Sequence, residues 1–259
     1  MNMPPGKARV PAHKLRLPWK ATELFAGFET VTLHMPEQER SANRSIFWRS
    51  ICSEHDARHF YRHLINNGPE LPWKMQDFLA GWLADEVNHA RGFKILYHSL
   101  YGTSFDDIEK ELHRRTIDFS QLAEFFGDLR SACLLFAYDE LVTTRVYQLS
   151  IPFYERLGVT ATNEWIRRLV YDEARHFRAM MRVIYEYCRD DILRTERMLT
   201  RIIDVDLAQD EYRGTFVLDH ACPEFPFTKS NLGELVRRGI IAPLRNSTLD
   251  IAAYMEVKS

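Results

Sequence analysis

The sequence predicts an all-α protein. Long segments repeat apolar residues at helical spacing, the alternation typical of strands is hard to find, and prolines and glycines cluster between these segments. With 46% hydrophobic residues, the 259-residue chain can fill one sizeable core. The formal net charge of −2 gives no electrostatic support for binding to nucleic acid.

The first elements follow from proline and glycine positions. Residues 1–40 are expected to form an N-terminal arm, because five prolines interrupt any long helix there, although a short helix over 24–33 is allowed. The first long helix is predicted from about Ser41 to Asn66, where an Asn-Asn-Gly-Pro run ends it. The second spans about Pro72 to Tyr101, and Gly102 stops it.

Two more long helices are predicted after a polar connection. This connection, Thr103 to Asp118, has room for one short helix. The third long helix runs from about Phe119 to Leu157, and Pro152 is expected to end or kink it. The fourth spans about Thr162 to Arg189. Together the four predict a helical bundle over residues 41–190.

Residues 191–259 are expected to pack on the bundle, so that the chain forms a single domain. An amphipathic helix is predicted from Asp190 to about Glu211, and a last helix near Asn231 to Ile241. No segment approaches ~18 uninterrupted apolar residues, so a membrane partner is not expected. The basic N-terminus lacks the apolar run of a secretory signal, and a cytoplasmic location is therefore predicted.

Each predicted long helix carries a glutamate in its apolar stripe. A buried ionised carboxylate is costly unless it is paired or binds a metal. In two helices a histidine follows the glutamate by three residues, and this spacing places both side chains on one helix face. The candidate metal ligands are Glu54, Glu86, His89, Glu140, Glu173 and His176.

The order of these residues repeats. A lone glutamate precedes each Glu-x-x-His pair, by 32 residues in the first half and by 33 in the second. One helix, a turn and most of a second, antiparallel helix separate the lone glutamate from the pair, so the two lie at the same height along the bundle. A chain of this length contains about one Glu-x-x-His by chance, whereas this chain has two. The repeat predicts a two-metal site; the alternative is a set of salt-bridged or surface residues.

Both pairs directly follow an aspartate. Asp85 and Asp172 lie one residue off the ligand face, where a carboxylate can accept the second imidazole N–H of a ligand histidine on the opposite helix. We expect Asp85 to accept from His176 and Asp172 to accept from His89. The alternative is that both aspartates are ordinary surface residues.

These motifs resemble a known superfamily. Asp85-Glu86-Val87-Asn88-His89 and Asp172-Glu173-Ala174-Arg175-His176, with Glu54 and Glu140, are similar to the ferritin-like non-haem di-iron carboxylate proteins. The nearer branch is the oxygen-activating one of multicomponent hydroxylases, acyl-carrier-protein desaturases and arylamine N-oxygenases. The resemblance covers about Ser41 to Arg189. It implies a ferritin-like four-helix bundle with extra N- and C-terminal segments and the six ligands named above.

Four positions bear on which member of this branch the chain resembles. Phe93 stands where the ribonucleotide reductase small subunit has its radical tyrosine, so a tyrosyl radical is excluded there. Leu169 stands where the N-oxygenases have a third histidine ligand, so N-oxygenation is not excluded but loses its best marker. Thr143 and Thr144 follow Glu140 by three and four residues, where desaturases and hydroxylases respectively place a threonine near the oxygen that they activate. A hydroxyl there is expected to relay a proton; the alternative is that it bonds to its own helix backbone.

The resemblance implies an O2-dependent oxygenase or oxidase that attacks a C–H or N–H bond of a small or carrier-bound organic substrate. Mixed carboxylate and imidazole ligands suit two iron ions, with manganese as an alternative. A ferredoxin or reductase is expected as external electron donor, since the sequence shows no flavin, nicotinamide or iron–sulfur motif. A homodimer is a candidate assembly. A ferroxidase or iron-handling protein, a manganese catalase-like enzyme and a metal-free scaffold are the alternatives.

Two weaker features are explained without a further functional site. His55, His59 and His63 recur every fourth residue and suggest a second metal site. Their stripe is turned roughly 100° or more from Glu54, however, so solvated or partly buried helix surface is favoured. Arg175 is expected to form a salt bridge to another helix rather than to act in catalysis.

Overall fold

The computed structural model describes residues 18–28, 31, 33, 35–208, 214–218, 220, 222 and 224–246. Within these ranges the regular elements are all helical and no strand occurs, so the all-α prediction is confirmed. No helix in the described part of the chain combines enough length with enough apolar character to cross a bilayer.

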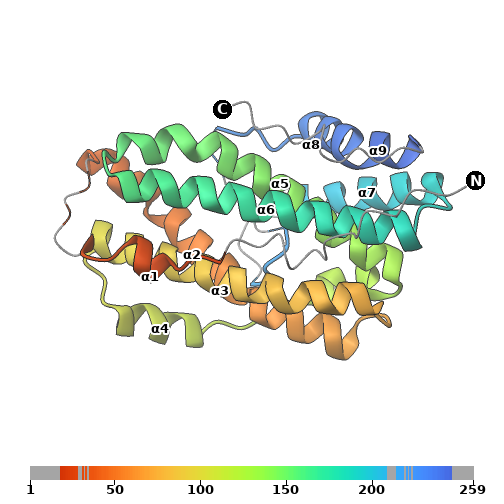
Figure 1. The fold of residues 1–259 in the computed structure, drawn as a ribbon, viewed down its shortest axis with the longest axis horizontal. Coiled ribbons are helices and arrows are strands. Elements are labelled where there is room, and N and C mark those ends of the chain that lie inside the picture. Colours follow the sequence, from red (N-terminus) through yellow and green to blue (C-terminus); the bar gives the residue numbers. More distant parts are fainter. Residues whose placement is uncertain are drawn as a thin grey trace, which may run out of the picture.

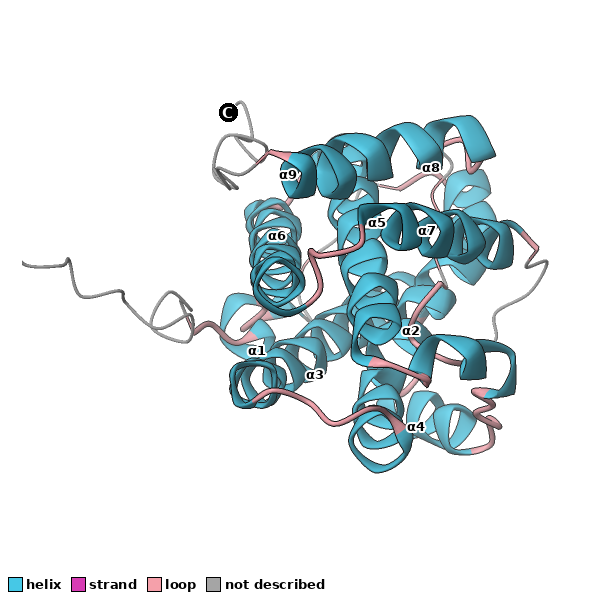
Figure 2. Ribbon diagram, turned by 90° about the vertical axis from the view of Figure 1, so that its right-hand side faces the viewer, coloured by secondary structure: helices cyan, strands magenta, loops and turns pink. Residues whose placement is uncertain are grey.

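Four long helices run lengthwise through the molecule and enclose its core (Figure 1). They are α2 (Glu37–Asn67), α3 (Trp73–Tyr101), α5 (Leu129–Arg156) and α6 (Thr160–Tyr187). Helix α2 packs along α3, α5 packs along α6, and α3 also contacts α6. In Figure 2, α3 and α6 lie toward one side of the molecule and α2 and α5 toward the other.

Helix α2 begins at Glu37 rather than near Ser41. Its apolar stripe starts only at Phe47, so hydrophobic periodicity gave no sign of the first turns. Two acidic residues in the first turn, Glu37 and Glu39, interact favourably with the positive end of the helix dipole. The helix start is therefore set by charge and by the preceding Pro36 rather than by burial.

The predicted third helix is two separate elements. A 3₁₀ segment, η3 (Ser120–Phe126), precedes α5. The break occurs because Asp128 caps α5, with its side chain accepting from the N–H of Ser131 at 3.1 Å. Pro152 lies inside α5 and does not end it. It stands close to the C-terminal end, where the missing N–H interrupts only the last turns.

The short segments differ from prediction at the N-terminus. Helix α1 covers only Ala21–Leu24, so the helix allowed over 24–33 is wrong; Gly27 turns the chain with φ 75°. Residues 1–17 of the predicted arm lie outside the described residues. Helix α1 packs against α3 and α6. The polar connection contains one helix, α4 (Phe105–His113), which Ser104 caps.

The C-terminal helices lie against α5 (Figure 1). Helix α7 contacts α5, and α8 contacts both α7 and α5. The predicted end of the fifth helix at Glu211 lies outside the described residues, and the last predicted helix begins earlier and is divided. The elements are α7 (Ile192–Leu207), α8 (Lys229–Val236), a π-helical segment η4 (Arg237–Ile241) and α9 (Ala242–Arg245).

The chain between α7 and α8 passes beside α2 and α5. Ser53 Oγ donates to the carbonyl of Phe216 at 3.1 Å, and the N–H of Leu218 donates to Asp139 Oδ1 at 2.7 Å. Phe216 and Leu218 have φ values of 71° and 63°, a left-handed conformation that costs a non-glycine residue about 1–2 kcal/mol. These side-chain contacts therefore hold a strained backbone in place.

Candidate metal centre

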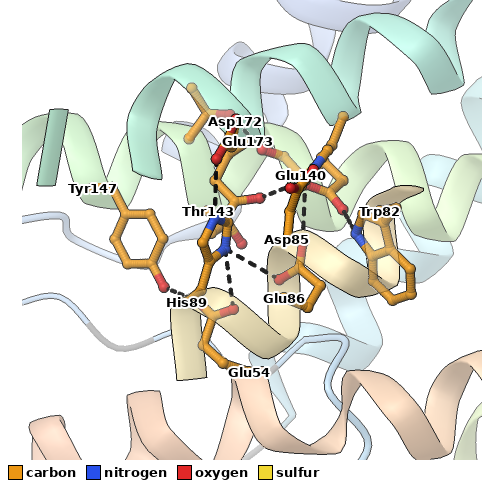
Figure 3. A network of polar contacts seen from close by, with 12 residues as sticks. Glu54, Trp82, Asp85, Glu86, His89, Glu140, Thr143, Tyr147, Asp172 and Glu173 are labelled. Carbon is orange, nitrogen blue, oxygen red and sulfur yellow. Dashed lines mark hydrogen bonds and ion pairs between the residues drawn. The ribbon is translucent and has the colours of Figure 1, made fainter. Parts of the chain in front are cut away.

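The six predicted ligands converge in one buried cluster between the four long helices. All of them except His176 are labelled in Figure 3. None of the six side chains belongs to a residue that is more than 4% exposed. Helix α2 contributes Glu54, α3 contributes Glu86 and His89, α5 contributes Glu140, and α6 contributes Glu173 and His176. The glutamates that interrupt the apolar stripes therefore all face the same small volume.

The cluster consists of two overlapping groups of four residues. Within each group, one ligand-type atom from every residue lies within 4.8 Å of the others. Glu86 and Glu173 belong to both groups, so their carboxylates would be shared if each group held an ion. Each end of the cluster adds one glutamate and one histidine. The groups are Glu54, Glu86, His89 and Glu173, and Glu86, Glu140, Glu173 and His176.

Several polar atoms of the cluster make no hydrogen bond with the described residues, and their contacts there are histidine–carboxylate ion pairs of 3.1–3.5 Å within the cluster. Buried polar atoms in folded proteins are normally paired, because an unpaired one loses its hydration without compensation. A pair of divalent cations would satisfy these atoms together. Oxygen and imidazole ligands without thiolates suit iron or manganese. The atoms without a hydrogen bond are Glu54 Oε2, Glu86 Oε1, Glu140 Oε2, Glu173 Oε1 and His89 Nδ1.

Both histidines turn the same nitrogen toward the carboxylates. The Nδ1 atoms of His89 and His176 lie 3.1–3.5 Å from glutamate oxygens of the cluster. The opposite Nε2 atoms lie 3.4 Å from Asp172 Oδ2 and 3.4 Å from Asp85 Oδ2, respectively, which is the cross-helix pairing expected from the sequence. An aspartate that accepts the Nε2 proton leaves the Nδ1 lone pair available to a metal.

Each aspartate is held by a second donor. Arg175 forms an ion pair with Asp85 on α3, so the predicted salt bridge to another helix is confirmed. Burial would raise the pKa of Asp85, but the hydrogen bond with His176 and the charge of Arg175 lower it below its ordinary value. Asp172 Oδ2 accepts from Trp19 Nε1 at 2.8 Å. Trp19 lies in the predicted arm, far along the chain from Asp172, and no sequence pattern connects them.

Two buried aromatic residues orient the outer glutamates. Trp82 Nε1 donates to Glu140 Oε1 at 2.8 Å, and the Tyr147 hydroxyl donates to Glu54 Oε1 (Figure 3). Both rings are buried, but helical periodicity alone gives no information on their polar ends. Trp82 therefore fixes the carboxylate at one end of the cluster, and Tyr147 fixes the carboxylate at the other.

Burial and like charges perturb the acid–base properties of the cluster. Burial raises the pKa of Glu86 well above its ordinary value, and the charge of Glu173 raises it further. Burial also raises the pKa of Glu140 to about 8, although the charge of His176 opposes this rise. Burial would lower the pKa of His89, but the charge of Glu86 and hydrogen bonds to carboxylates raise it well above its ordinary value. Without cations, the cluster therefore retains protons.

We expect the metal-free protein to lose thermal stability as the pH rises from about 5 to about 8. The pKa of Glu140 is raised from 4.5 to about 8 in the folded chain, so folding favours its protonated form. The stability that this group contributes is complete below its unfolded-state pKa and is lost as the pH passes through its folded-state pKa. Thermal unfolding across this range measures the loss. Glu140→Gln, which cannot ionise, should show a shallower decline; a wild-type curve independent of pH would contradict this expectation.

The two candidate threonines occupy different environments. Thr144 Oγ1 donates to the backbone carbonyl of Glu140 at 2.7 Å, which is the alternative considered for such residues. Thr143 instead lines a cavity of about 50 Å³ beside the ligand cluster, and its Oγ1 lies 3.1 Å from His220 Nε2. Burial lowers the pKa of His220 to about 4, so its ring is neutral at pH 7. Asp139 Oδ1, 3.4 Å from the same Nε2, favours the tautomer that carries its proton there. The single hydrogen on Nε2 is then shared between Asp139 Oδ1 and Thr143 Oγ1, and the Thr143 hydroxyl lines the cavity.

The histidine stripe of α2 stays apart from the cluster. His55 and His59 approach Asp56 closely enough to form a third group of ligand-type atoms. Asp56 is already ion-paired with Arg115, however. Burial, followed by neighbouring arginine and lysine charges, lowers the pKa of His55 to about 3. This concentration of positive charge disfavours a cation, and His63 stacks on an aromatic ring instead.

No family model matches the chain, and the comparisons with curated proteins and with solved structures give no match either. The superfamily resemblance inferred from the motifs therefore stays a prediction. Any functional proposal rests on the geometry and donor chemistry of the cluster itself.

Proposed function

We propose that this chain is an oxygen-activating di-iron oxidoreductase built on a ferritin-like four-helix bundle. One observation carries the proposal: two groups of four buried ligands share Glu86 and Glu173. A Glu-x-x-His pair from each of two helices and a glutamate from each of two others is the ligand arrangement of the di-iron carboxylate bundles. Two separate single-ion sites would not need shared carboxylates.

With two ferrous ions bound, the centre would reduce O2 for attack on a C–H or N–H bond of an organic substrate. Reduction of O2 to water and an inserted oxygen atom takes two electrons from the substrate and two from elsewhere. A ferredoxin or reductase is proposed as the donor of those two electrons, since the sequence shows no flavin, nicotinamide or iron–sulfur motif. Manganese is the alternative metal for the same ligands.

The protein's own contribution is to position the ligands and to exclude bulk water. Asp85 and Asp172 hold the two imidazoles, and Trp82 and Tyr147 hold the outer carboxylates. Buried aromatic side chains surround the cluster, and they keep solvent away from a reactive centre. The cavity beside Thr143 gives a small molecule or the end of a carrier-bound chain access to the ligand carboxylates.

The proposal is tested by anaerobic loading with ferrous iron, followed by elemental analysis and Mössbauer spectroscopy. We expect two irons per chain in a coupled pair and, with O2 and a reducing system, O2 consumption linked to substrate oxidation. A protein that binds no iron, or binds it as isolated ions, would contradict the proposal. A cage assembly with many irons per chain would identify an iron-handling protein instead, and rapid peroxide disproportionation with bound manganese would identify a catalase-like enzyme.

Valine substitutions at the two threonines should separate their roles. Thr143→Val removes the hydroxyl that faces the cavity, and we expect substrate oxidation to fall by about tenfold or more, since a positioned proton donor typically contributes at least that much. Thr144→Val removes only a bond to the helix backbone and should change the rate by less than about twofold. Steady-state rates are measured together with iron content. Equal losses in both variants would show that Thr143 has no special role.

A further inference from the structure

Two small cavities follow the groove between α2 and α5, and both are lined by Ser50. The inner cavity, about 50 Å³, reaches the ligands Glu54, Glu86 and Glu173. The outer cavity, about 40 Å³, is lined from α2 by residues as early as Asn43. From Asn43 to Glu54 the helix rises about 16 Å, so the two cavities together extend from the ligand cluster toward one end of the groove.

Three aromatic rings and a carboxylate surround the outer cavity. Phe47, Phe153 and Tyr154 all line it, and their ring centroids lie 5.2–6.3 Å apart. Glu224, from the segment between α7 and α8, lines the same cavity and is exposed. The negative faces of aromatic rings attract cations, and a group of rings beside a carboxylate is a chemistry that binds ammonium groups.

Among the described residues, no lysine or arginine lines either cavity. The histidine in the inner cavity, His220, is neutral at pH 7 because burial lowers its pKa to about 4. Arg156 lies over Phe153, with its guanidinium carbon 5.7 Å from the ring centroid, but it pairs with Glu39 at 3.1 Å and does not line the cavity. The described lining therefore offers a counter-ion to an ammonium group, Glu224, and none to a carboxylate or phosphate.

We propose that the organic substrate of the centre is a short aliphatic amine, whose ammonium group binds in the outer cavity between the aromatic rings and Glu224. Its hydrocarbon end then passes Ser50 into the inner cavity beside the ligand carboxylates. The outer cavity holds about three water-sized groups and the inner cavity about four. Together they suit a primary amine of about six carbons. This inference rests on the proposed oxidation at the two-metal cluster, because it assigns the inner end of the groove to the reacting part of the substrate.

Calorimetric titration of the full chain with hexylammonium, hexanol and hexanoate tests the proposal. The titrations are made without O2, on both the metal-free and the ferrous-loaded protein, so that binding is measured without turnover. We expect hexylammonium to bind at least about tenfold more tightly than hexanoate. Glu224→Gln should weaken hexylammonium binding by about tenfold and leave hexanol binding unchanged. Phe153→Leu, which keeps an apolar side chain but removes a ring, should weaken it severalfold.

Glu234→Gln is the control, because Glu234 is a half-exposed glutamate on α8 that pairs with Arg237 and Arg238 and lines neither cavity. It should bind hexylammonium as the wild type does. Equal affinity for hexylammonium and hexanoate, or unchanged ammonium binding in Glu224→Gln, would overturn the proposal. If iron binds and O2 is consumed but hexylammonium does not bind, only the substrate assignment fails. If no iron binds, the proposed oxidation fails, while titration of the metal-free protein still tests the ammonium site.

Discussion

Replacing Glu173 with alanine is expected to weaken both proposed metal positions, whereas Glu54→Ala weakens only one. Glu173 belongs to both ligand groups, and its loss leaves three residues in each. Glu54 belongs to one group, and its loss leaves the other complete. Loss of a partner that only supports a ligand already costs about 10–100-fold in metal affinity, so loss of a direct ligand should cost at least about 100-fold. Metal content after loading and dialysis should approach zero in Glu173→Ala and one ion per chain in Glu54→Ala.

The matched control is Glu164→Ala. Glu164 is also on α6, but its half-exposed side chain pairs with Arg168 one turn away. Such pairs contribute little to stability, and this variant should bind two ions as the wild type does. If Glu173→Ala retained one tightly bound ion, the two groups would not share this carboxylate, and the bridged arrangement would be wrong.

Gly92→Ala should destabilise the protein strongly, although alanine is the better helix former. A Cβ atom at Gly92 would lie 2.3 Å from Trp165 Nε1 and 2.8 Å from Trp165 Cε2. Trp165 is fully buried and packs edge-on against Phe93 and Tyr154, so its ring has no free space to enter. Overpacking of this kind costs about 1–3 kcal/mol, and it separates α3 from α6. We expect the melting temperature to fall by roughly 2–12 °C.

Gly81→Ala tests the same substitution on the same helix without the clash. A Cβ atom at Gly81 would meet no atom within 4 Å apart from the helix's own backbone and chain neighbours. Its only large effect is the gain in helix propensity, up to about 1 kcal/mol. The melting temperature of Gly81→Ala should therefore stay the same or rise. A similar rise in Gly92→Ala would show that α3 and α6 are less closely packed than the structure indicates.

Because α3 and α6 each carry a Glu-x-x-His pair, Gly92→Ala should also reduce metal affinity. Gly92 lies one helix turn from His89 on α3, and Trp165 lies two turns before Glu173 on α6. A shift at this contact changes the distance between the two histidines. Metal titration of the folded variant at low temperature distinguishes this effect from simple unfolding.

The convergence of the six side chains could be predicted because the sequence pattern that encodes it is local. A glutamate and a histidine three residues apart face the same way on any helix, and the near-equal spacing of Glu54 from Glu86 and of Glu140 from Glu173 placed the two halves level. The aspartates next to these pairs were predictable for the same reason. Their positions follow from helix geometry and do not depend on how distant segments pack.

The residues that sequence analysis missed contact the cluster from distant parts of the chain. Trp19 and His220 come from segments with no helical period, and their partners Asp172 and Thr143 lie 153 and 77 residues away. Only the packed structure determines such contacts. Helix ends were missed where a polar cap determines them. At Asp128 the apolar pattern continues through the cap, so the start of α5 was not recognised.

Each half of the cluster has its own tryptophan, and this gives the protein two built-in optical reporters. The indole of Trp19 donates a hydrogen bond to Asp172, the partner of His89, and its ring centroid lies 6.1 Å from that of His89. The indole of Trp82 is bonded to Glu140 in the other half. A paramagnetic ion bound beside either indole would quench the fluorescence of that indole. Variants in which one of these two is the only tryptophan left of the chain's five would therefore follow the filling of each half separately, and would show whether the first ion helps the second to bind.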